Sequence, residues 1–104
     1  QWLLNLVTNS RESISIRKKA LFWAGQIKTP FRTLAALYDQ MPESEMREQM
    51  IFVFSQRKES AAIDKLIGIA KNDPDREMRK KALFWLGQSK DERVTAFLTD
   101  IINR

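Results

Sequence analysis

The chain has 104 residues, 43% hydrophobic and 30% charged, so its length and composition are those of one globular domain and do not indicate a disordered segment. No apolar run approaches the ~20 residues that a membrane span needs. Cysteine and histidine are both absent, which excludes disulfides, thiolate nucleophiles and the commonest zinc sites, while a net charge of +5 raises the question of an anionic partner.

The first expected element is a short helix at the amino-terminal end of the chain. Leu3, Leu6 and Val7 have the spacing of an apolar helix face. In a chain built of helix pairs, residues 1–9 would be the remnant second helix of a preceding repeat. We expect Trp2 to be exposed there by the loss of a neighbouring helix.

The next segment, IRKKALFWAGQ at Ile16–Gln26, recurs twice later in the chain. Met78–Gln88 repeats it at nine of eleven positions, and Met46–Gln56 is a more diverged copy. Copies 30 to 32 residues apart are typical of solenoids, in which each unit buries its apolar face against its neighbours. The predicted repeats are residues 10–40, 41–72 and 73–104.

Each repeat begins with a helix that has four apolar residues on one face. These sets are Ile16, Ala20, Trp23 and Ala24; Met46, Met50, Val53 and Phe54; and Met78, Ala82, Trp85 and Leu86. Trp23 and Trp85 occupy the position that Val53 takes in the middle copy. We therefore expect both indole rings to fill core volume rather than to stack on nucleobases.

A second helix follows in each repeat, with apolar residues at positions i, i+3, i+4 and i+7. These stripes are Leu34, Leu37, Tyr38 and Met41; Ile63, Leu66, Ile67 and Ala70; and Val94, Phe97, Leu98 and Ile101. Gly68 lies in the middle of such a helix, where glycine costs about 1 kcal/mol relative to alanine. We interpret it as a point of close approach by another backbone, from a neighbouring helix or a partner.

Helix ends are marked by capping residues and prolines. Thr29–Pro30 and Asp73–Pro74 each predict an N-cap followed by a proline at the first helical position. Gly87 is the expected C-cap of the last first helix, and Asp91 begins the helix after it. Asp73 with Asp75 could instead suggest calcium, but the loop lacks the further oxygen ligands and the glycine of such sites, so capping is favoured.

The third copy, from Asp73–Asp75 through Met78–Arg79 to Leu86–Gly87, resembles the short bacterial HEAT-like repeats, including those of the phycobilisome-lyase type. The resemblance covers essentially the whole chain and departs from the family pattern at Ser55, where the family prefers glycine. It implies an all-α fold, a right-handed α-α superhelix (HEAT-like α-solenoid) of antiparallel helix pairs whose second helices line the concave side. It also implies a scaffold or adaptor function.

Arginines recur in register at Arg17, Arg47 and Arg79. Such a ladder could hold the phosphates of a nucleic acid. The favoured interpretation is structural, with each arginine bridging to an acid or a carbonyl of the adjacent layer, for which acids near the turns such as Glu43 and Asp75 are candidates.

Nucleic-acid binding, in the manner of the DNA glycosylases built from HEAT-like repeats, stays the alternative function. Its candidate anion-binding residues are Lys18, Lys80 and Lys81 on the first helices. Because Glu48 interrupts this basic stripe in the middle copy, nucleic acid is the less favoured partner. A further alternative is that the repeats support a catalytic domain of a larger enzyme.

The favoured function is a non-catalytic scaffold that binds a polypeptide on its concave or end surfaces. The concave candidates lie on the second helices: Arg32, Asp64, Lys65, Thr95 and Thr99. No catalytic residues, metal or cofactor are predicted, since the usual nucleophile and base pairs and a glycine-rich phosphate loop are missing. The terminal helices also suggest self-association as a second kind of protein contact.

Overall fold

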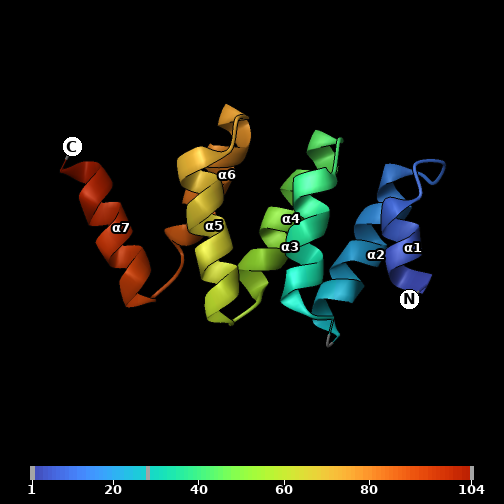
Figure 1. The fold of residues 1–104 in the computed structure, drawn as a ribbon, viewed down its shortest axis with the longest axis horizontal. Helices are drawn as coiled ribbons and strands as arrows, with labels where there is room; N and C mark the ends of the chain where they lie inside the picture. Colours follow the sequence, from blue (N-terminus) through green and yellow to red (C-terminus); the bar gives the residue numbers. More distant parts are fainter. Residues whose placement is uncertain (1, 28, 104) are drawn as a thin grey trace.

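The computed structural model describes residues 2–27 and 29–103, and every regular element within them is an α-helix. These helices are α1 (Trp2–Thr8), α2 (Ile14–Gln26), α3 (Phe31–Gln40), α4 (Ser44–Gln56), α5 (Ser60–Asn72), α6 (Arg76–Leu86) and α7 (Glu92–Ile102). They follow one another along a body of 45 × 27 × 18 Å, with α1 and α7 at opposite ends (Figure 1). The prediction of an all-α fold is confirmed.

The helices are arranged in two layers. The first helices α2, α4 and α6 pack successively on one another, while α3, α5 and α7 form a second row in which α5 contacts both neighbours over a shorter length. The rows are joined where α1 packs on α2 and where α5 packs on α4 and α6. Stacked helix pairs of this kind form an α-α solenoid. The repeat boundaries 10–40, 41–72 and 73–104, with 1–9 as a remnant, remain our proposal.

One continuous apolar core runs between the layers. Its largest fully buried side chains are Phe54, Leu21, Leu34, Met46, Met50, Ile51, Leu66, Met78, Leu86, Val7 and Val94. Most of them belong to the predicted stripes of the first and second helices, because a helix with apolar residues at i, i+3 and i+4 must bury that face against its neighbours.

The orientation of α2 differs from the sequence prediction. Trp23 is 58% exposed and Ile16 is also exposed, so their predicted burial is wrong. Ala20 and Ala24 are buried as predicted. The rest of the buried face consists of Arg17, Leu21 and Gly25. With Gly25 turned inward, Trp23 lies about 200° around the helix from it and therefore faces outward.

Trp85 occupies the position of Trp23 but packs against the core without being fully buried. Its ring is half-buried and packs on Phe52 of α4, with ring centroids 5.3 Å apart. The remaining predicted core residues of α6, Met78, Ala82 and Leu86, are buried. The prediction of a core tryptophan is therefore wrong for Trp23 and partly right for Trp85. The equivalence with buried Val53 does not carry over to α2, because one position of the repeat has different surroundings in each copy.

Gly25 allows α2 to approach α4 closely. A Cβ atom at this position would collide with the Cγ1 atom of Val53. Gly68, by contrast, has no atom of another described helix within 4 Å of the position of a Cβ. The expectation of a close approach by a neighbouring helix at Gly68 is therefore wrong, and Gly25 is where such an approach occurs.

Substituting these two glycines is expected to have opposite effects on stability. Gly25→Ala should lower the free energy of unfolding by about 1–3 kcal/mol, because α2 and α4 must separate to admit the methyl group. Gly68→Ala should raise it by about 1 kcal/mol through helix propensity alone. Urea denaturation of both variants measures the difference, and a Gly25→Ala protein as stable as the parent would contradict the close packing.

The start of α6 also differs from the prediction. Asp75, not Asp73, is the N-cap, and its carboxylate accepts a hydrogen bond from the backbone N–H of Glu77 at 2.9 Å. The Asp73 carboxylate accepts instead from the hydroxyl of Tyr38 at 2.6 Å and from the backbone N–H of Asp75 at 2.9 Å. Burial, and then this bond to Asp73, raise the pKa of Tyr38 far above its ordinary value, so the hydroxyl stays a donor.

The other predicted helix ends are partly confirmed. Pro30 is the N-cap of α3 and lies outside the helix without a side-chain cap, while the Thr29 carbonyl accepts a hydrogen bond from Arg57 at 2.8 Å. The predicted Thr29 cap is therefore wrong. Gly87 does end α6, and the Asp91 carboxylate caps α7 by accepting from the backbone N–H of Arg93 at 2.8 Å.

Candidate interaction surfaces

Arg17 lies inside the protein, 3% exposed, where α1, α2 and the start of α4 meet. Its Nε atom donates to the carbonyl of Val7 at 2.9 Å, and its Nη atoms donate to both carboxylate oxygens of Glu43 at 2.9 and 3.2 Å. The hydrogen bonds from Arg17 hold the pKa of the Glu43 carboxyl below its usual range. These contacts leave the guanidinium no access to an external phosphate.

The equivalent arginines make fewer contacts, but of the same kind. An Nη atom of Arg47 lies 3.4 Å from the carboxylate of Asp75, the N-cap of the next first helix. Arg79 donates to the backbone carbonyl of Asp73 at 2.6 Å. Each arginine therefore points toward the turn that begins a first helix, and in two of the three copies that turn belongs to the following repeat.

The second helices place their predicted binding residues on a polar surface. Lys65 lies 2.6 Å from the carboxylate of Asp39 on α3, with its Nζ atom 5.4 Å from the centre of the Tyr38 ring. The other candidates on this row, Arg32, Thr95 and Thr99, are exposed. Lys65 thus joins α5 to α3 rather than standing free for a partner.

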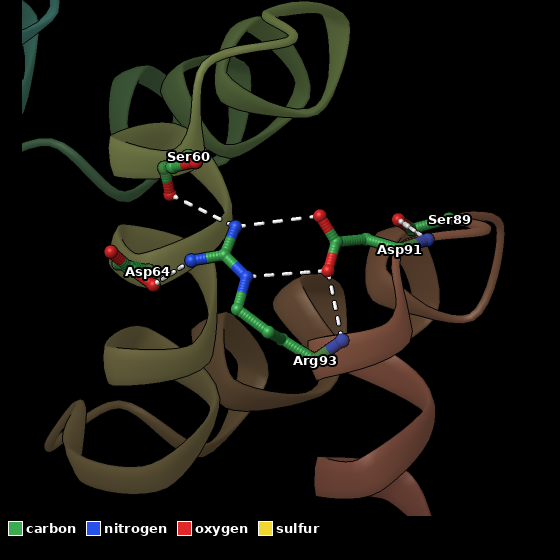
Figure 2. Close-up of polar contacts among 5 residues, drawn as sticks. All are labelled: Ser60, Asp64, Ser89, Asp91 and Arg93. Atoms are coloured by element: carbon green, nitrogen blue, oxygen red, sulfur yellow. Dashed lines mark hydrogen bonds and ion pairs between the residues drawn. The ribbon is translucent and has the colours of Figure 1, made fainter.

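Asp64 is held in a network around Arg93, a residue that the sequence did not single out (Figure 2). The Arg93 guanidinium donates to Asp64 at 2.8 Å and to the Asp91 carboxylate at 3.3 and 3.4 Å, and its Nη2 atom lies 3.5 Å from the Ser60 carbonyl. Hydrogen bonds from Arg93 keep the pKa of the Asp91 carboxyl below its usual range. The network joins α7 to α5 at the level where α7 begins.

A different surface lies on the first helices, where a groove of about 560 Å³ is lined by residues of α2 and α4. We call it the α2–α4 groove; its lining includes Lys18, Lys19, Phe22 and Trp23 of α2, and Glu45 and Gln49 of α4. The rings of Phe22 and Trp23 pack edge to face with centroids 5.3 Å apart. This is an apolar depression bordered by two lysines.

A second depression of about 530 Å³, the α4–α6 groove, lies beside the first. Its lining includes Glu48, Gln49 and Phe52 of α4, and Lys80, Lys81, Phe84 and Trp85 of α6. Phe84 is 58% exposed and packs edge to face on Trp85, with ring centroids 5.0 Å apart. Because Gln49 lines both grooves, the two depressions adjoin across α4.

The lysines predicted as anion-binding residues line these grooves. Within the described ranges, Lys18 and its neighbour Lys19 form no ion pair. Lys80 lies 3.7 Å from Glu77, and Lys81 lies 3.5 Å from Glu48. The lysines of α6 are therefore paired with carboxylates, whereas the two lysines of α2 share their groove with the carboxylate of Glu45 and are not paired with it.

The sequence prediction missed the aromatic character of this face. Phe22, Phe52 and Phe84 occupy the same position in the three copies, and none of them is fully buried. The sequence does contain a signal for this surface, because all three copies have phenylalanine at one position beside the apolar stripe of the first helix. The copies also place Trp23 and Trp85 next to it, and these two tryptophans widen the apolar surface.

Two negative findings apply to residues 2–27 and 29–103. They contain no group of three or more acidic residues placed to hold a metal ion. None of their helices has the length and apolar character needed to cross a membrane.

Comparison with known proteins identifies the family. A search of curated proteins and a search of solved structures found no match. The family model of HEAT repeats matches residues 31–104, from the start of α3 to the end of the chain. This range is more than half of the chain and includes the helices α3 to α7. The chain therefore belongs to the HEAT repeat family.

Proposed function

We propose that the chain is a non-catalytic scaffold that binds a polypeptide in the two grooves of its first helices. HEAT repeats typically serve as protein-interaction scaffolds. The observation that carries the proposal is the adjoining aromatic surface formed by Phe22 and Trp23 on one side of Gln49 and by Phe84 and Trp85 on the other. Aromatic side chains in apolar depressions with a polar rim are the usual anchors of protein interfaces.

The first helices are favoured as the binding surface because the charged side chains of the second helices are already engaged in ion pairs. On the second helices, Asp64 and Lys65 already form ion pairs with Arg93 and Asp39. Such exposed pairs contribute little to binding unless a partner replaces them. The concave-face sites at Arg32, Thr95 and Thr99, and self-association through the terminal helices, therefore rank below the grooves.

Nucleic acid is a poorer fit to the same surface. Glu45 lines the α2–α4 groove, and Glu48 and Glu77 line the α4–α6 groove. A phosphate backbone laid across the first helices would bring negative charges against all three carboxylates. A polypeptide can place neutral or basic side chains there.

Selection from a phage-displayed library of peptides of about 15 residues tests the proposal. We expect Trp23→Ala and Phe84→Ala each to weaken binding of the selected peptides at least tenfold, because each removes an anchor from a groove. Trp2→Ala is the matched control, since Trp2 is 72% exposed and lies outside both grooves.

Two results would count against this function. One is a set of selected peptides that bind the parent, Trp23→Ala and Phe84→Ala proteins equally. The other is a failure to select any peptide, together with tight DNA binding. In that case labelled DNA would bind this protein more tightly than it binds a basic control protein of equal charge, and the affinity would depend steeply on salt.

A further inference from the structure

The charges around the two grooves are distributed unevenly. Helix α2 carries no acidic residue, and its one paired cation, Arg17, is buried. Its two other cations, Lys18 and Lys19, border the α2–α4 groove and form no ion pair with the described residues. In the α4–α6 groove the two lysines are balanced by Glu48 and Glu77. Among the described residues, Glu45 is the one carboxylate in the lining of the α2–α4 groove, so two lysines face one acidic residue there. An occupant of both grooves would therefore meet an excess of positive charge at the α2 end only.

The spacing of the grooves fits an α-helical occupant. Neighbouring packed helices lie about 8–10 Å apart, so the depressions between α2 and α4 and between α4 and α6 are separated by about that distance. Side chains at positions i and i+7 of a helix are about 10.5 Å apart on the same face. In an extended chain, side chains on one face recur about every 6.7 Å, which matches the spacing less well.

Hydrogen bonding favours the same conclusion. The helices that form the grooves satisfy the backbone groups of their middle turns internally, so they offer no row of free N–H and C=O groups to an extended chain. An extended peptide in an apolar groove would leave its own backbone groups without partners. A helix satisfies these groups itself and presents only side chains.

We propose that the two grooves take an amphipathic peptide helix with apolar side chains at i and i+7, and with carboxylates beside the first of them facing Lys18 and Lys19. The inference rests on the function proposed above and adds the conformation, charge and direction of the partner. The first apolar side chain would contact Phe22 and Trp23, and the second would contact Phe84 and Trp85.

Three synthetic helical peptides of about 15 residues test the inference. They share apolar residues at i, i+3, i+4 and i+7 and differ only at the positions flanking the first one, which carry glutamate, glutamine or lysine. At low salt the glutamate peptide is expected to bind the parent protein about tenfold more tightly than the glutamine peptide. The lysine peptide is expected to be the weakest binder of the three. The difference should shrink as salt screens the charges.

Charge reversal on α2 provides the specific variant. The double substitution Lys18→Glu with Lys19→Glu should make the lysine peptide the tightest binder. The matched control is Arg32→Glu with Lys71→Glu, two exposed cations on α3 and α5, which changes the net charge equally and should leave the order unchanged. Circular dichroism of both variants establishes that the helices are retained.

The outcomes separate this inference from the proposed function. Equal binding of the three peptides, all weakened by Trp23→Ala, would overturn the acidic partner while the groove function stands. Failure of every designed helix to bind, with library peptides still dependent on Trp23, would overturn the helical partner alone. A reversal of preference in the Arg32 and Lys71 control would place the site on the second helices and would overturn both.

Discussion

Replacing Phe54 with alanine is expected to lower the free energy of unfolding by about 3–5 kcal/mol. Its side chain is fully buried in α4, and its ring packs on Phe31 and Tyr38 of α3, with centroids 5.1 and 6.0 Å away. Removing the ring loses its transfer free energy and leaves a cavity that the helices around it fill only in part. Because domains of this size are stable by roughly 5–15 kcal/mol, the variant should stay folded but with a reduced margin.

Phe84→Ala is the matched control for this substitution, since it removes the same side chain from an exposed site on α6. It should change the free energy of unfolding by less than about 1 kcal/mol. Guanidinium denaturation of both variants gives the comparison. Equal losses of unfolding free energy in the two variants would mean that the Phe54 side chain is not at the centre of the core. A smaller dependence of the unfolding free energy on denaturant for Phe54→Ala alone would indicate that the two ends of the helix stack unfold separately.

Arg17→Met is expected to cost about 2–4 kcal/mol, the second large effect. Methionine keeps an unbranched apolar side chain but leaves the Val7 carbonyl without its donor and Glu43 without its cation. Arg47→Met is the control at the same position of the next copy. It should cost less, because the Arg47 side chain is more exposed and its contact with Asp75 is 3.4 Å long.

This cost should depend on pH in a defined direction. The pKa of Glu43 is lowered in the folded protein, so its pairing with Arg17 stabilises the fold fully above the ordinary glutamate pKa of about 4.3. The stabilisation is lost as the pH falls through the lowered pKa. The stability difference between parent and Arg17→Met should therefore be largest near neutral pH and smaller in acid. A difference that grows in acid would contradict the Arg17–Glu43 pairing.

The fold could be predicted because the packing repeats along the sequence. Apolar residues such as Met46, Met50 and Phe54 recur at helical spacing in each copy, and only stacked helix pairs bury all of these faces together. Two helix ends were also predicted correctly, the end of α6 at Gly87 and the start of α7 at Asp91. Both depend on hydrogen bonds between residues close in sequence, which a local pattern can predict.

The rotation of α2 could not be predicted in this way. The repeat pattern predicts that Arg17 bridges to an acid such as Glu43, but not that its side chain lies inside the protein. The burial depends on a further hydrogen bond to the Val7 carbonyl of α1. Gly25 is turned inward by its contact with Val53, a position 28 residues away. Both causes are tertiary, and together they turn Trp23 outward.

The candidate site was predicted only in part. Lys18, Lys80 and Lys81 were identified as a possible binding stripe, and they do border the two grooves. The grooves themselves were missed because they arise from the outward turn of Trp23 and the half-exposed position of Trp85. Without that rotation, the aromatic residues of the first helices would be counted as core.

The most direct test of the account is to locate the bound peptide on the protein. Uniformly ¹⁵N-labelled protein would be titrated with the glutamate peptide and followed by amide chemical shifts. The account predicts that shift changes concentrate on α2, α4 and α6, around Lys19, Gln49 and Phe84. Changes concentrated on α3, α5 and α7, around Arg32 and Thr95, would contradict it.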